Sequence, residues 1–462
     1  MQHVHFIGIG GTGLSAIAKV LLESGYSVSG SDQEYSPLAK AVDAAGAQVF
    51  IGHQASNVNG SDIVIRSSAV PDDNPEVQAA LEKSIPVLKR ADYLGSLMEG
   101  RQGIAVAGSH GKTTTTAMLA WVLTALDQDP TFIVGGVVSN LDTNARAGKG
   151  DAFVIEADEY DYMFLGLKPK IAVITNVEHD HPDIFHTPEV FRRAFLDFVR
   201  VLPPDGILLA CGDDPGASDI MTNASKSGYQ VISYGIESSH YDYFADNIVI
   251  NHFGGFDFDM LHDDSLVTSV SLQVPGDHNV KNALASLAVI DQMDLPVIDA
   301  ARALEEFIGA GRRFQVIGDI DGVTLIDDYA HHPTEIKATL AAAKARYPHR
   351  KIWAVWQPHT YSRTKTLFSE FVSSFDDADS VLVTEIYRSR EPFDPEFSSI
   401  QVVQAMDHLN AYFSGSLADT TKNLLDNLRT GDVVLVLSAG DATQICQDLM
   451  QLLSKQTKSK NR

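Results

Sequence analysis

The chain has 462 residues, of which 44% are apolar and 21% charged, as in ordinary soluble globular proteins. Its formal net charge is −25 at pH 7, which argues against a nucleic-acid partner because nucleic-acid binding needs a basic face. No stretch approaches about 18 uninterrupted apolar residues, so the sequence predicts no transmembrane helix and no membrane partner.

The beginning of the chain and its cysteines indicate a compartment. The first residues lead directly into an apolar run, without a basic segment or a cleavage site. Cys211 and Cys446 lie far apart and match neither a disulfide framework nor a zinc pattern. We therefore expect two free thiols in a reducing compartment, a cytoplasmic protein, and about two to four domains.

Residues 1–99 predict a small α/β unit with a parallel sheet. A strand at 3–7 leads into a glycine run and a helix at 14–24. A second strand at 26–29 ends in an acid about 20 residues after the glycines, where dinucleotide-type folds bind a ribose. A helix at 36–46 and strands at 48–51 and 62–66 follow. The candidate nucleotide contacts are Gly10, Gly11, Thr12, Gly13, Ser31, Asp32, His53, Ser67 and Ser68.

These glycines alone indicate only a phosphate near a helix N-terminus. They leave open a nicotinamide-dependent dehydrogenase, although nothing downstream looks like a hydride-transfer site. That alternative gives no use to the second glycine loop or to the histidine-rich stretch described next.

The stretch 103–116 predicts a phosphate cradle and opens the second unit. A buried strand at 104–107 is followed by the loop Gly108-Ser109-His110-Gly111, then by Lys112, Thr113 and a helix to about residue 126. Loop and helix N–H groups can surround a phosphate, the lysine can reach the terminal phosphates, and the threonine hydroxyl can bind Mg²⁺. The loop is shorter than the standard spacing, whose first glycine would fall at Val106.

Two later strands of this unit deliver acids and histidines. The strand at 151–155 ends in Glu156, our first choice for a Mg²⁺ anchor. The alternative is a solvated acidic loop, which has more weight for Glu159 and Asp161 than for Glu156. The strand at 171–175 is followed by Glu178-His179-Asp180-His181. Two histidines and two acids at a strand end predict contact with a cation.

The rest of the chain predicts an antiparallel β appendage at 229–275, a helix at 280–291 and a third α/β unit. Asn279 and Asn282 lie one helical turn apart, and both can read a purine edge. The glycine-rich joint at 309–314 precedes a second open α/β sheet with strands at 323–326, 351–357, 380–385 and 433–437 and a helix at 333–345. Its strand ends carry Asp328, His331, His359 and Arg363.

Six motifs in the family order resemble the Mur ligases, the ATP-dependent amide-forming enzymes of peptidoglycan precursor synthesis. The motifs are Gly-Ser-His-Gly-Lys-Thr-Thr at 108–114, Glu-Ala-Asp-Glu at 156–159, Thr-Asn-Val-Glu-His-Asp-His at 175–181, Gly-Asp-His-Asn at 276–279 with Asn282, Gly-Arg-Arg-Phe at 311–314, and Asp-Asp-Tyr-Ala-His-His-Pro at 327–333. The resemblance implies three domains: a Rossmann-like UDP-sugar domain at 1–99, a P-loop ATPase-type domain at 100–312 and a Rossmann-like amino-acid domain at 313–462.

The branch of the family is a further expectation. The glycine run and Gln-Pro-His-Thr-Tyr-Ser-Arg at 357–363 resemble the branch that joins L-alanine to the lactyl carboxylate of UDP-N-acetylmuramate through an acyl phosphate. The alternative is a recycling ligase that adds the tripeptide L-Ala-γ-D-Glu-diaminopimelate, which is expected to lack the 357–363 stretch. Several Mur ligases carry a carbamylated lysine shortly after the motif histidine, and the alanine branch does without it. No lysine lies between His181 and Asp205, which is consistent with that branch. Thr360 stands where some members have arginine, which leaves Arg363 as the expected carboxylate clamp.

The resemblance also implies roles for residues. Lys112 holds the β- and γ-phosphates, Thr113 and Glu156 bind one Mg²⁺ (or Mn²⁺), and His181 binds a second. The other expected ATP contacts are Gly108, Ser109, His110, Gly111, Thr114, His278, Asn279, Asn282, Arg313 and Asp328. His331, a candidate base, lines the amino-acid pocket with His359 and Arg363. We expect a monomer or weak homodimer; a nucleotide-binding protein without catalysis remains a third alternative.

Overall fold

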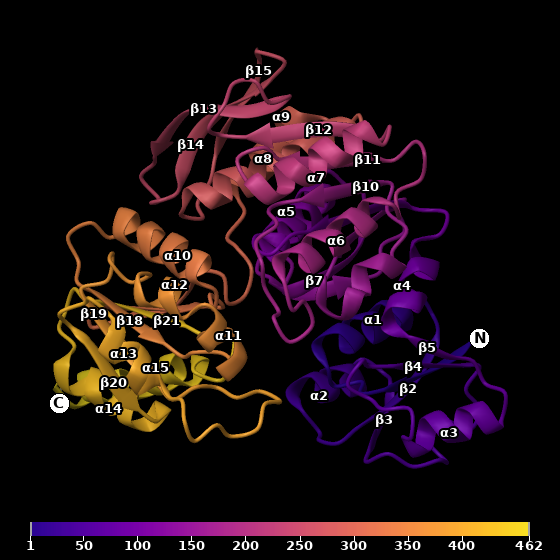
Figure 1. Ribbon diagram of the computed structural model, residues 1–462, viewed down its shortest axis with the longest axis horizontal. Coiled ribbons are helices and arrows are strands. Elements are labelled where there is room, and N and C mark those ends of the chain that lie inside the picture. The colour runs from indigo at the N-terminus through magenta and orange to yellow at the C-terminus, as the bar shows by residue number, and fades with distance from the viewer. Residues whose placement is uncertain (1, 461–462) are drawn as a thin grey trace.

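The structure, a computed structural model, describes residues 2–460, with the side chains of residues 2–455. Three sheets with flanking helices form three lobes (Figure 1). The first lobe lies at the lower right of that view, the central lobe at the top and the third at the lower left. The predicted α/β class with three units is therefore confirmed.

The first lobe is a parallel sheet in the order β3-β2-β1-β4-β5. Strand β2 is longer than predicted, because Ser31 and Asp32 still pair with Phe50 and Ile51 of β3. These two polar residues are thus the end of a strand rather than a loop. The elements are β1 (His3–Ile7), α1 (Thr12–Glu23), β2 (Ser27–Asp32), α2 (Pro37–Ala44), β3 (Gln48–Ile51), β4 (Ile63–Arg66), α3 (Pro75–Glu82), β5 (Val87–Lys89) and α4 (Arg90–Met98).

The central lobe is built on ten strands in the order β15-β14-β13-β12-β11-β10-β6-β9-β7-β8. The strands from β12 to β7 of that order run parallel to one another, whereas the edge strand β8 is antiparallel to β7. The expectation of an antiparallel unit over 229–275 is wrong for β12, which pairs parallel with β11, and right for β13–β15. Because β13 also pairs with β12, the appendage continues the nucleotide-type sheet.

The elements of the central lobe are β6 (Gln102–Ala107), α5 (Lys112–Ala125), β7 (Thr131–Val138), β8 (Thr143–Arg146), β9 (Ala152–Glu156), η1 (Tyr160–Gly166), β10 (Ile171–Ile174), α6 (Pro188–Val199), β11 (Ile207–Cys211), α7 (Pro215–Lys226), β12 (Gln230–Gly235), β13 (Tyr243–Ile250), β14 (Phe256–His262), β15 (Ser265–Ser271), α8 (Asp277–Gln292) and α9 (Val297–Glu305).

The third lobe has a sheet in the order β16-β17-β21-β18-β19-β20, parallel except for β16. The sequence missed its two edge strands, because their residues are mostly half-buried or exposed and carry no continuous apolar run. The elements are β16 (Gln315–Ile320), β17 (Val323–Asp328), α10 (Pro333–Arg346), β18 (Ile352–Trp356), α11 (Tyr361–Thr366), α12 (Phe368–Val372), β19 (Ser380–Thr384), α13 (Ser399–Ala405), β20 (Ala411–Gly415), α14 (Leu417–Asn427), β21 (Val433–Leu437) and α15 (Thr443–Lys460).

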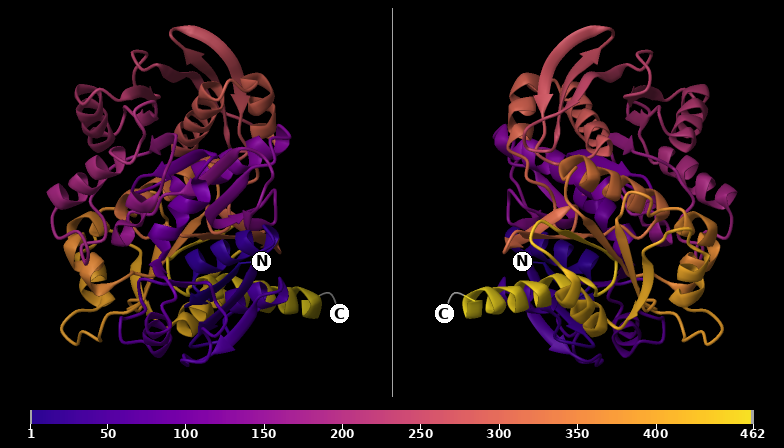
Figure 2. Two further views of the ribbon diagram at one scale, coloured as in Figure 1. Left: turned by 90° about the vertical axis from the view of Figure 1, so that its right-hand side faces the viewer. Right: turned by 90° about the vertical axis from the view of Figure 1, so that its left-hand side faces the viewer.

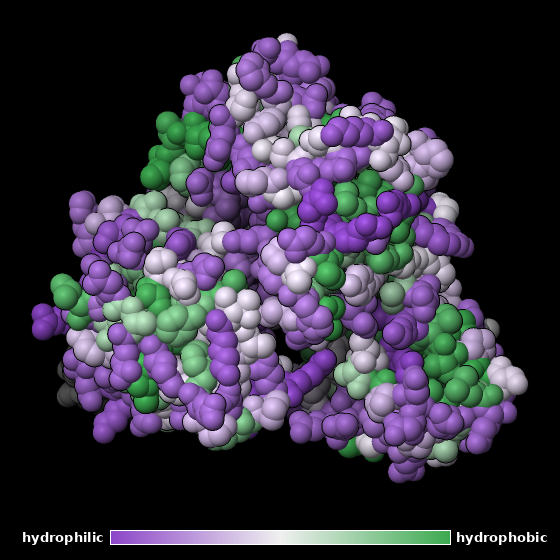
Figure 3. Space-filling model, in the orientation of Figure 1, coloured by the Kyte–Doolittle hydropathy of each residue, from purple (hydrophilic) through white to green (hydrophobic). Residues whose placement is uncertain are grey.

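The lobes differ in how they are joined. One apolar cluster runs from the first lobe into the central one, through residues such as Phe6, Leu94 and Phe153. The third lobe has apolar clusters of its own, and Figure 2 shows its last helix reaching out toward the C-terminus. Figure 3 shows a largely hydrophilic face, hollowed where the lobes meet. Within residues 2–460, no helix combines the length and apolar character needed to cross a membrane.

Candidate functional site

The loop 108–111 joins β6 to α5 at the C-terminal end of the central sheet. Gly108 has a φ of +140°, and a Cβ there would lie 2.0 Å from the Thr175 hydroxyl oxygen. The His110 N–H donates to the Asn176 side chain at 2.8 Å, which fixes the loop on the end of β10. The first N–H groups of α5 have no partner within the helix and are available to an anion.

Lys112 is the first residue of α5, and its ammonium group is enclosed by acceptors. It donates to the carbonyl oxygens of Gly108 and Ser109 and lies 2.9 Å from a Glu159 carboxylate oxygen. Burial works to lower the pKa of Lys112, but Glu159 and Glu156 outweigh it and raise that pKa. The lysine is therefore held charged at the mouth of the loop.

Glu159 is a residue that the sequence analysis did not select, because a solvated acidic loop was a stronger alternative for it than for Glu156. Its side chain is 1% exposed and contacts both Lys112 and, at 3.6 Å, Nε2 of His181. Burial works to raise the pKa of Glu159, but Lys112 and His181 hold it below its ordinary value. Its position in the acidic run 156–161 gave no sign of this burial.

Glu156 ends β9 beside Thr113. The threonine hydroxyl donates to one carboxylate oxygen at 3.0 Å, and the Gly135 N–H donates to the other at 2.7 Å. Burial raises the pKa of Glu156, although Lys112 and Arg313 oppose that rise. A hydroxyl and a carboxylate next to a phosphate-type loop are the oxygen ligands that suit Mg²⁺, so this pair fits the predicted cation.

His181 lies on the far side of Glu159 and meets the third lobe. Its neighbour Asp180 accepts from Nε of Arg363 at 2.9 Å, and both side chains are nearly buried. The other guanidinium nitrogens face His359 at 3.0 Å and His181 at 3.5 Å. The structure thus brings Arg363 to the predicted cation residue, with its donors already engaged by protein groups.

The two predicted amino-acid histidines are uncharged near neutral pH. Burial lowers the pKa of His331 to about 3 and that of His359 to about 4. Their rings lie 5.9 Å apart, and Nδ1 of His331 is 2.9 Å from the Tyr329 carbonyl oxygen. Both imidazoles are therefore free of charge at neutral pH, but pKa values this low make them weak bases.

A cavity of about 300 Å³ lies between the central and third lobes. It is lined by the glycine loop, α8, the joint at 309–314 and the start of α10. Among its lining residues are the predicted ATP contacts His110, Gly111, Thr114, His278, Asn279, Asn282, Arg313 and Asp328. The structure therefore gathers most of the predicted nucleotide residues around one space.

The paired asparagines lie inside helix α8, which begins three residues earlier than predicted. The Asn282 amide donates to Oδ1 of Asn279 at 3.0 Å, and the Asn279 amide donates to the Pro275 carbonyl at 2.7 Å. The Thr115 hydroxyl donates to Oδ1 of Asn282 at 3.2 Å. These bonds hold both side chains against the cavity in a defined orientation.

Asp328 organises the joint between the lobes. Its carboxylate accepts from the Phe314 N–H at 2.6 Å and from the Ala330 N–H at 2.7 Å. Burial raises the pKa of Asp328 to about 6, although Arg313 opposes that rise. Arg313 itself donates to the Thr113 hydroxyl at 3.3 Å, so the joint reaches the phosphate-type loop.

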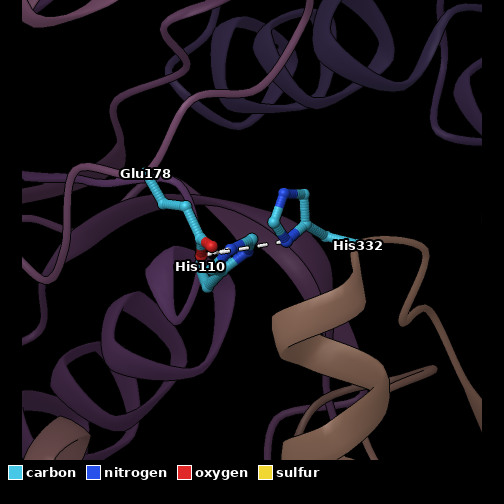
Figure 4. Close-up of side chains that lie close together, drawn as sticks. All are labelled: His110, Glu178 and His332. Carbon is cyan, nitrogen blue, oxygen red and sulfur yellow. Dashed lines mark hydrogen bonds and ion pairs between the residues drawn. The ribbon is translucent and has the colours of Figure 1, made fainter. Parts of the chain in front are cut away.

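A second cluster joins the loop to α10, as Figure 4 shows. Nε2 of His110 lies 3.0 Å from Glu178, and Nδ1 of His332 lies 3.8 Å from the same carboxylate oxygen. Ligand atoms of these three residues all lie within 4.8 Å of one another, an arrangement that can hold a metal ion. The sequence analysis selected His110 only as a residue of the loop and did not group it with Glu178 and His332.

In the first lobe, the predicted polar residues gather at the ends of β1, β2 and β4 but bond mainly to one another. The Gly10 N–H donates to Asp32 at 2.8 Å. Asp32, the acid expected to bind a ribose, therefore holds the glycine run. Ser31 donates to the buried Glu76 at 2.5 Å and lies 3.0 Å from His53. Glu76 was not predicted. Gly11, Ser67 and Ser68 lie at the same edge.

A smaller cavity of about 140 Å³ connects the first lobe to the central one. Thr12 and Gly13 line it from α1, and Glu156 lines it from the end of β9. Arg90, which the sequence analysis did not select, also lines it and lies 3.1 Å from Asp158. Glu156, the carboxylate proposed to bind the cation, therefore lies between the cavity beside the first-lobe glycine run and the glycine loop 108–111.

Three domain models match the chain along most of its length. They are the Mur ligase family, catalytic domain at residues 3–102, the Mur ligase middle domain at 106–290 and the Mur ligase, glutamate ligase domain at 312–440. Their matched ranges follow the three sheets of the structure.

Curated relatives and solved structures agree with these matches. UDP-N-acetylmuramate–L-alanine ligase of Clostridium botulinum is 41% identical over 447 residues, 96% of either chain. The same enzyme of Syntrophus aciditrophicus is 40% identical, covering 98% of this chain and 94% of the relative. The crystal structure of UDP-N-acetylmuramate–alanine ligase from Thermotoga maritima has a TM-score of 0.83 at 29% identity, covering 99% and 100%. A murein peptide ligase from Psychrobacter arcticus gives 0.71 at 26%, covering 98% and 99%.

Proposed function

Because this chain belongs to the Mur ligase family, we propose that its sites join L-alanine to the lactyl carboxylate of UDP-N-acetylmuramate. The products are UDP-N-acetylmuramoyl-L-alanine, ADP and phosphate, and the reaction belongs to peptidoglycan precursor synthesis. The observation that carries this function is 41% identity over 96% of the chain to a ligase of that name. The nicotinamide-dependent alternative is set aside, since the relatives named above are ligases.

The reaction begins with transfer of the γ-phosphate of ATP to the sugar carboxylate. A carboxylate is a poor acylating agent, and conversion to an acyl phosphate provides a leaving group. We assign the β- and γ-phosphates to Lys112, whose charged, enclosed ammonium group supports this role. Asn279 and Asn282 line the cavity and are proposed to hold adenine, and Arg313 lines it from the joint and is proposed to contact the nucleotide.

Thr113 and Glu156 would hold one Mg²⁺, and His181 a second. The Mg²⁺, when bound, neutralises charge on the phosphates. Glu156 also lines the smaller cavity beside Gly13. Contacts proposed for the UDP-sugar lie at the edge of the first sheet and include Thr12 and Gly13.

The alanine amine must be neutral before it attacks the acyl phosphate. His331 is the base we propose for this proton: its imidazole is uncharged at neutral pH, and its pKa of about 3 makes it a weak base. Arg363 is proposed to bind the alanine carboxylate. Its guanidinium group is held by Asp180, His181 and His359, so binding requires these contacts to be shared or exchanged.

Phosphate release tests the function and the branch together. Mg-ATP and UDP-N-acetylmuramate are mixed with the protein, adding L-alanine to one tube and L-Ala-γ-D-Glu-diaminopimelate to another. Release with alanine alone supports the alanine branch. Release only with the tripeptide assigns the recycling reaction, and release in neither tube overturns ligase activity. Lys112→Met is expected to lower kcat by about 100-fold or more in the active tube.

A further inference from the structure

Glu335 lies where three parts of the proposed site meet. It is the third residue of α10, and its side chain is 10% exposed. Its carboxylate lies 3.3 Å from Nδ1 of His110, 3.6 Å from Nη1 of Arg313 and 3.3 Å from Nδ1 of His331. One residue of the third lobe thus contacts the glycine loop, the joint and the proposed amino-acid pocket.

The two oxygens of this carboxylate have separate partners. Oε2 accepts from the backbone N–H groups of His331 at 3.0 Å and His332 at 3.3 Å, which completes the capping box of α10. Oε1 faces His110 and Arg313 instead. The local helix cap therefore uses one oxygen and leaves the other for contacts away from the helix.

The ring of His110 is held from both sides. Glu178 of the central lobe lies 3.0 Å from Nε2, while Glu335 of the third lobe lies near Nδ1. The Thr334 hydroxyl also donates to Glu178 at 2.8 Å. The start of α10 is therefore bound to the loop through side chains of both lobes, and His332 packs against the same ring at 4.7 Å.

We propose that Glu335 is a positioning residue of the ligase. When the third lobe closes, Glu335 fixes the position of the glycine loop through His110 and also fixes the position of Arg313. The proposal rests on the proposed function, because it assigns Arg313 and the loop to ATP. Glu335 touches neither the phosphates nor the reacting atoms in this role. It makes the geometry of the loop depend on closure.

The variant Glu335→Gln separates positioning from helix capping. Glutamine also completes a capping box, so the variant keeps α10 and loses the charge that faces His110 and Arg313. We expect kcat to fall about 10- to 100-fold, with a much smaller change in KM for ATP. The thermal midpoint should fall modestly, because the His110–Glu335 contact also contributes to stability. In parallel, the NMR titration of His110 should move to lower pH, which reports loss of the Glu335 contact and which loss of the helix cap alone would leave unchanged.

Glu370→Gln is the matched control, because Glu370 is an exposed glutamate of the same lobe. If Glu335 acts through His110, then adding Glu335→Gln to His110→Asn should cost at most a few-fold more. An unchanged kcat in Glu335→Gln or an unmoved His110 titration would overturn the inference. So would a double variant whose loss in kcat equals the product of the losses in the two single variants. Wild-type phosphate release tests the ligase function separately, and the NMR titration tests the Glu335 contact even without turnover.

Discussion

The partly buried histidines of the site carry different charges because different groups face them. His110 lies between the carboxylates of Glu178 and Glu335, which outweigh its burial and raise its pKa to about 9. At His331 and His359, burial dominates and Arg363 adds repulsion, so their pKa values fall to about 3 and 4. One site therefore contains a protonated imidazole that binds carboxylates and neutral imidazoles that can accept protons.

The charge on His110 predicts a pH dependence of stability. Between pH 6.5 and 9, the folded protein keeps a proton that the unfolded chain has lost, so stability should decrease as the pH rises through this range. The raised pKa corresponds to about 3 kcal/mol. The variant His110→Gln should show a smaller alkaline decline, as measured by thermal midpoints from pH 6 to 10; the raised pKa of His181 accounts for a residual decline. His252→Gln, at an exposed histidine, is the control; an unchanged decline in His110→Gln would contradict the assignment.

At the scale of elements, the strand β6, its loop and helix α5 form a unit that depends on β10. The loop is bonded to Asn176, and Gly108 packs directly on Thr175. Lys112 lies at the mouth of the loop because α5 starts immediately after the loop. The position of the phosphate-type lysine is therefore set by how closely the loop can approach the end of the neighbouring strand.

Gly108→Ala tests this close approach. A Cβ at this position would lie 2.0 Å from the Thr175 hydroxyl oxygen and 3.1 Å from the Asn176 backbone, in a backbone conformation that costs other residues about 1–3 kcal/mol. We expect ATP affinity to fall at least about tenfold, measured by calorimetry, and the thermal midpoint to fall.

Gly60→Ala is the control for this variant. Gly60 also has a positive φ, of +83°, but a Cβ there would meet no atom within 4 Å. Gly60→Ala therefore shares the backbone strain of Gly108→Ala and lacks its steric clash. Wild-type ATP affinity in Gly108→Ala would show that the loop can shift without consequence.

At the scale of the whole molecule, the two junctions between lobes differ in chemistry. The first and central lobes share an apolar cluster. The central and third lobes meet through charged and polar contacts, among them Asp180 with Arg363, Glu178 with Thr334 and His110 with Glu335. Water can replace polar contacts more readily than apolar ones, so we expect the third lobe to be the one that opens.

Asp180→Asn tests this junction. Removing one charge leaves the buried Arg363 unpaired, which costs about 3–5 kcal/mol in the closed arrangement. The chain should therefore shift toward an open form, with a larger radius of gyration by small-angle scattering and a higher KM for alanine. Asp205→Asn removes an exposed partner of Lys170 and serves as the control. An unchanged radius in Asp180→Asn would show that this ion pair does not hold the lobes together.

The sequence by itself determined the local units of this protein and its family. Apolar runs that end in glycine or polar residues located β1, β6, β9, β10 and β17, because a buried parallel strand must be continuously apolar. The motif Gly-Lys-Thr at 111–113 identified the loop, since its backbone and side chains have to meet a phosphate. Six motifs in order then identified the family that the comparisons show.

Only the tertiary structure decided which charged side chains face one another. Glu159 and Glu335 stand in sequence contexts typical of a solvated loop and a helix cap, yet they are buried beside Lys112 and His110. Asp180 and Arg363 are 183 residues apart and bond across two lobes. Such pairings depend on how separate sheets pack, and no local pattern records that packing. The motifs located the groups of the site, and the packing of the lobes set their charge and partners.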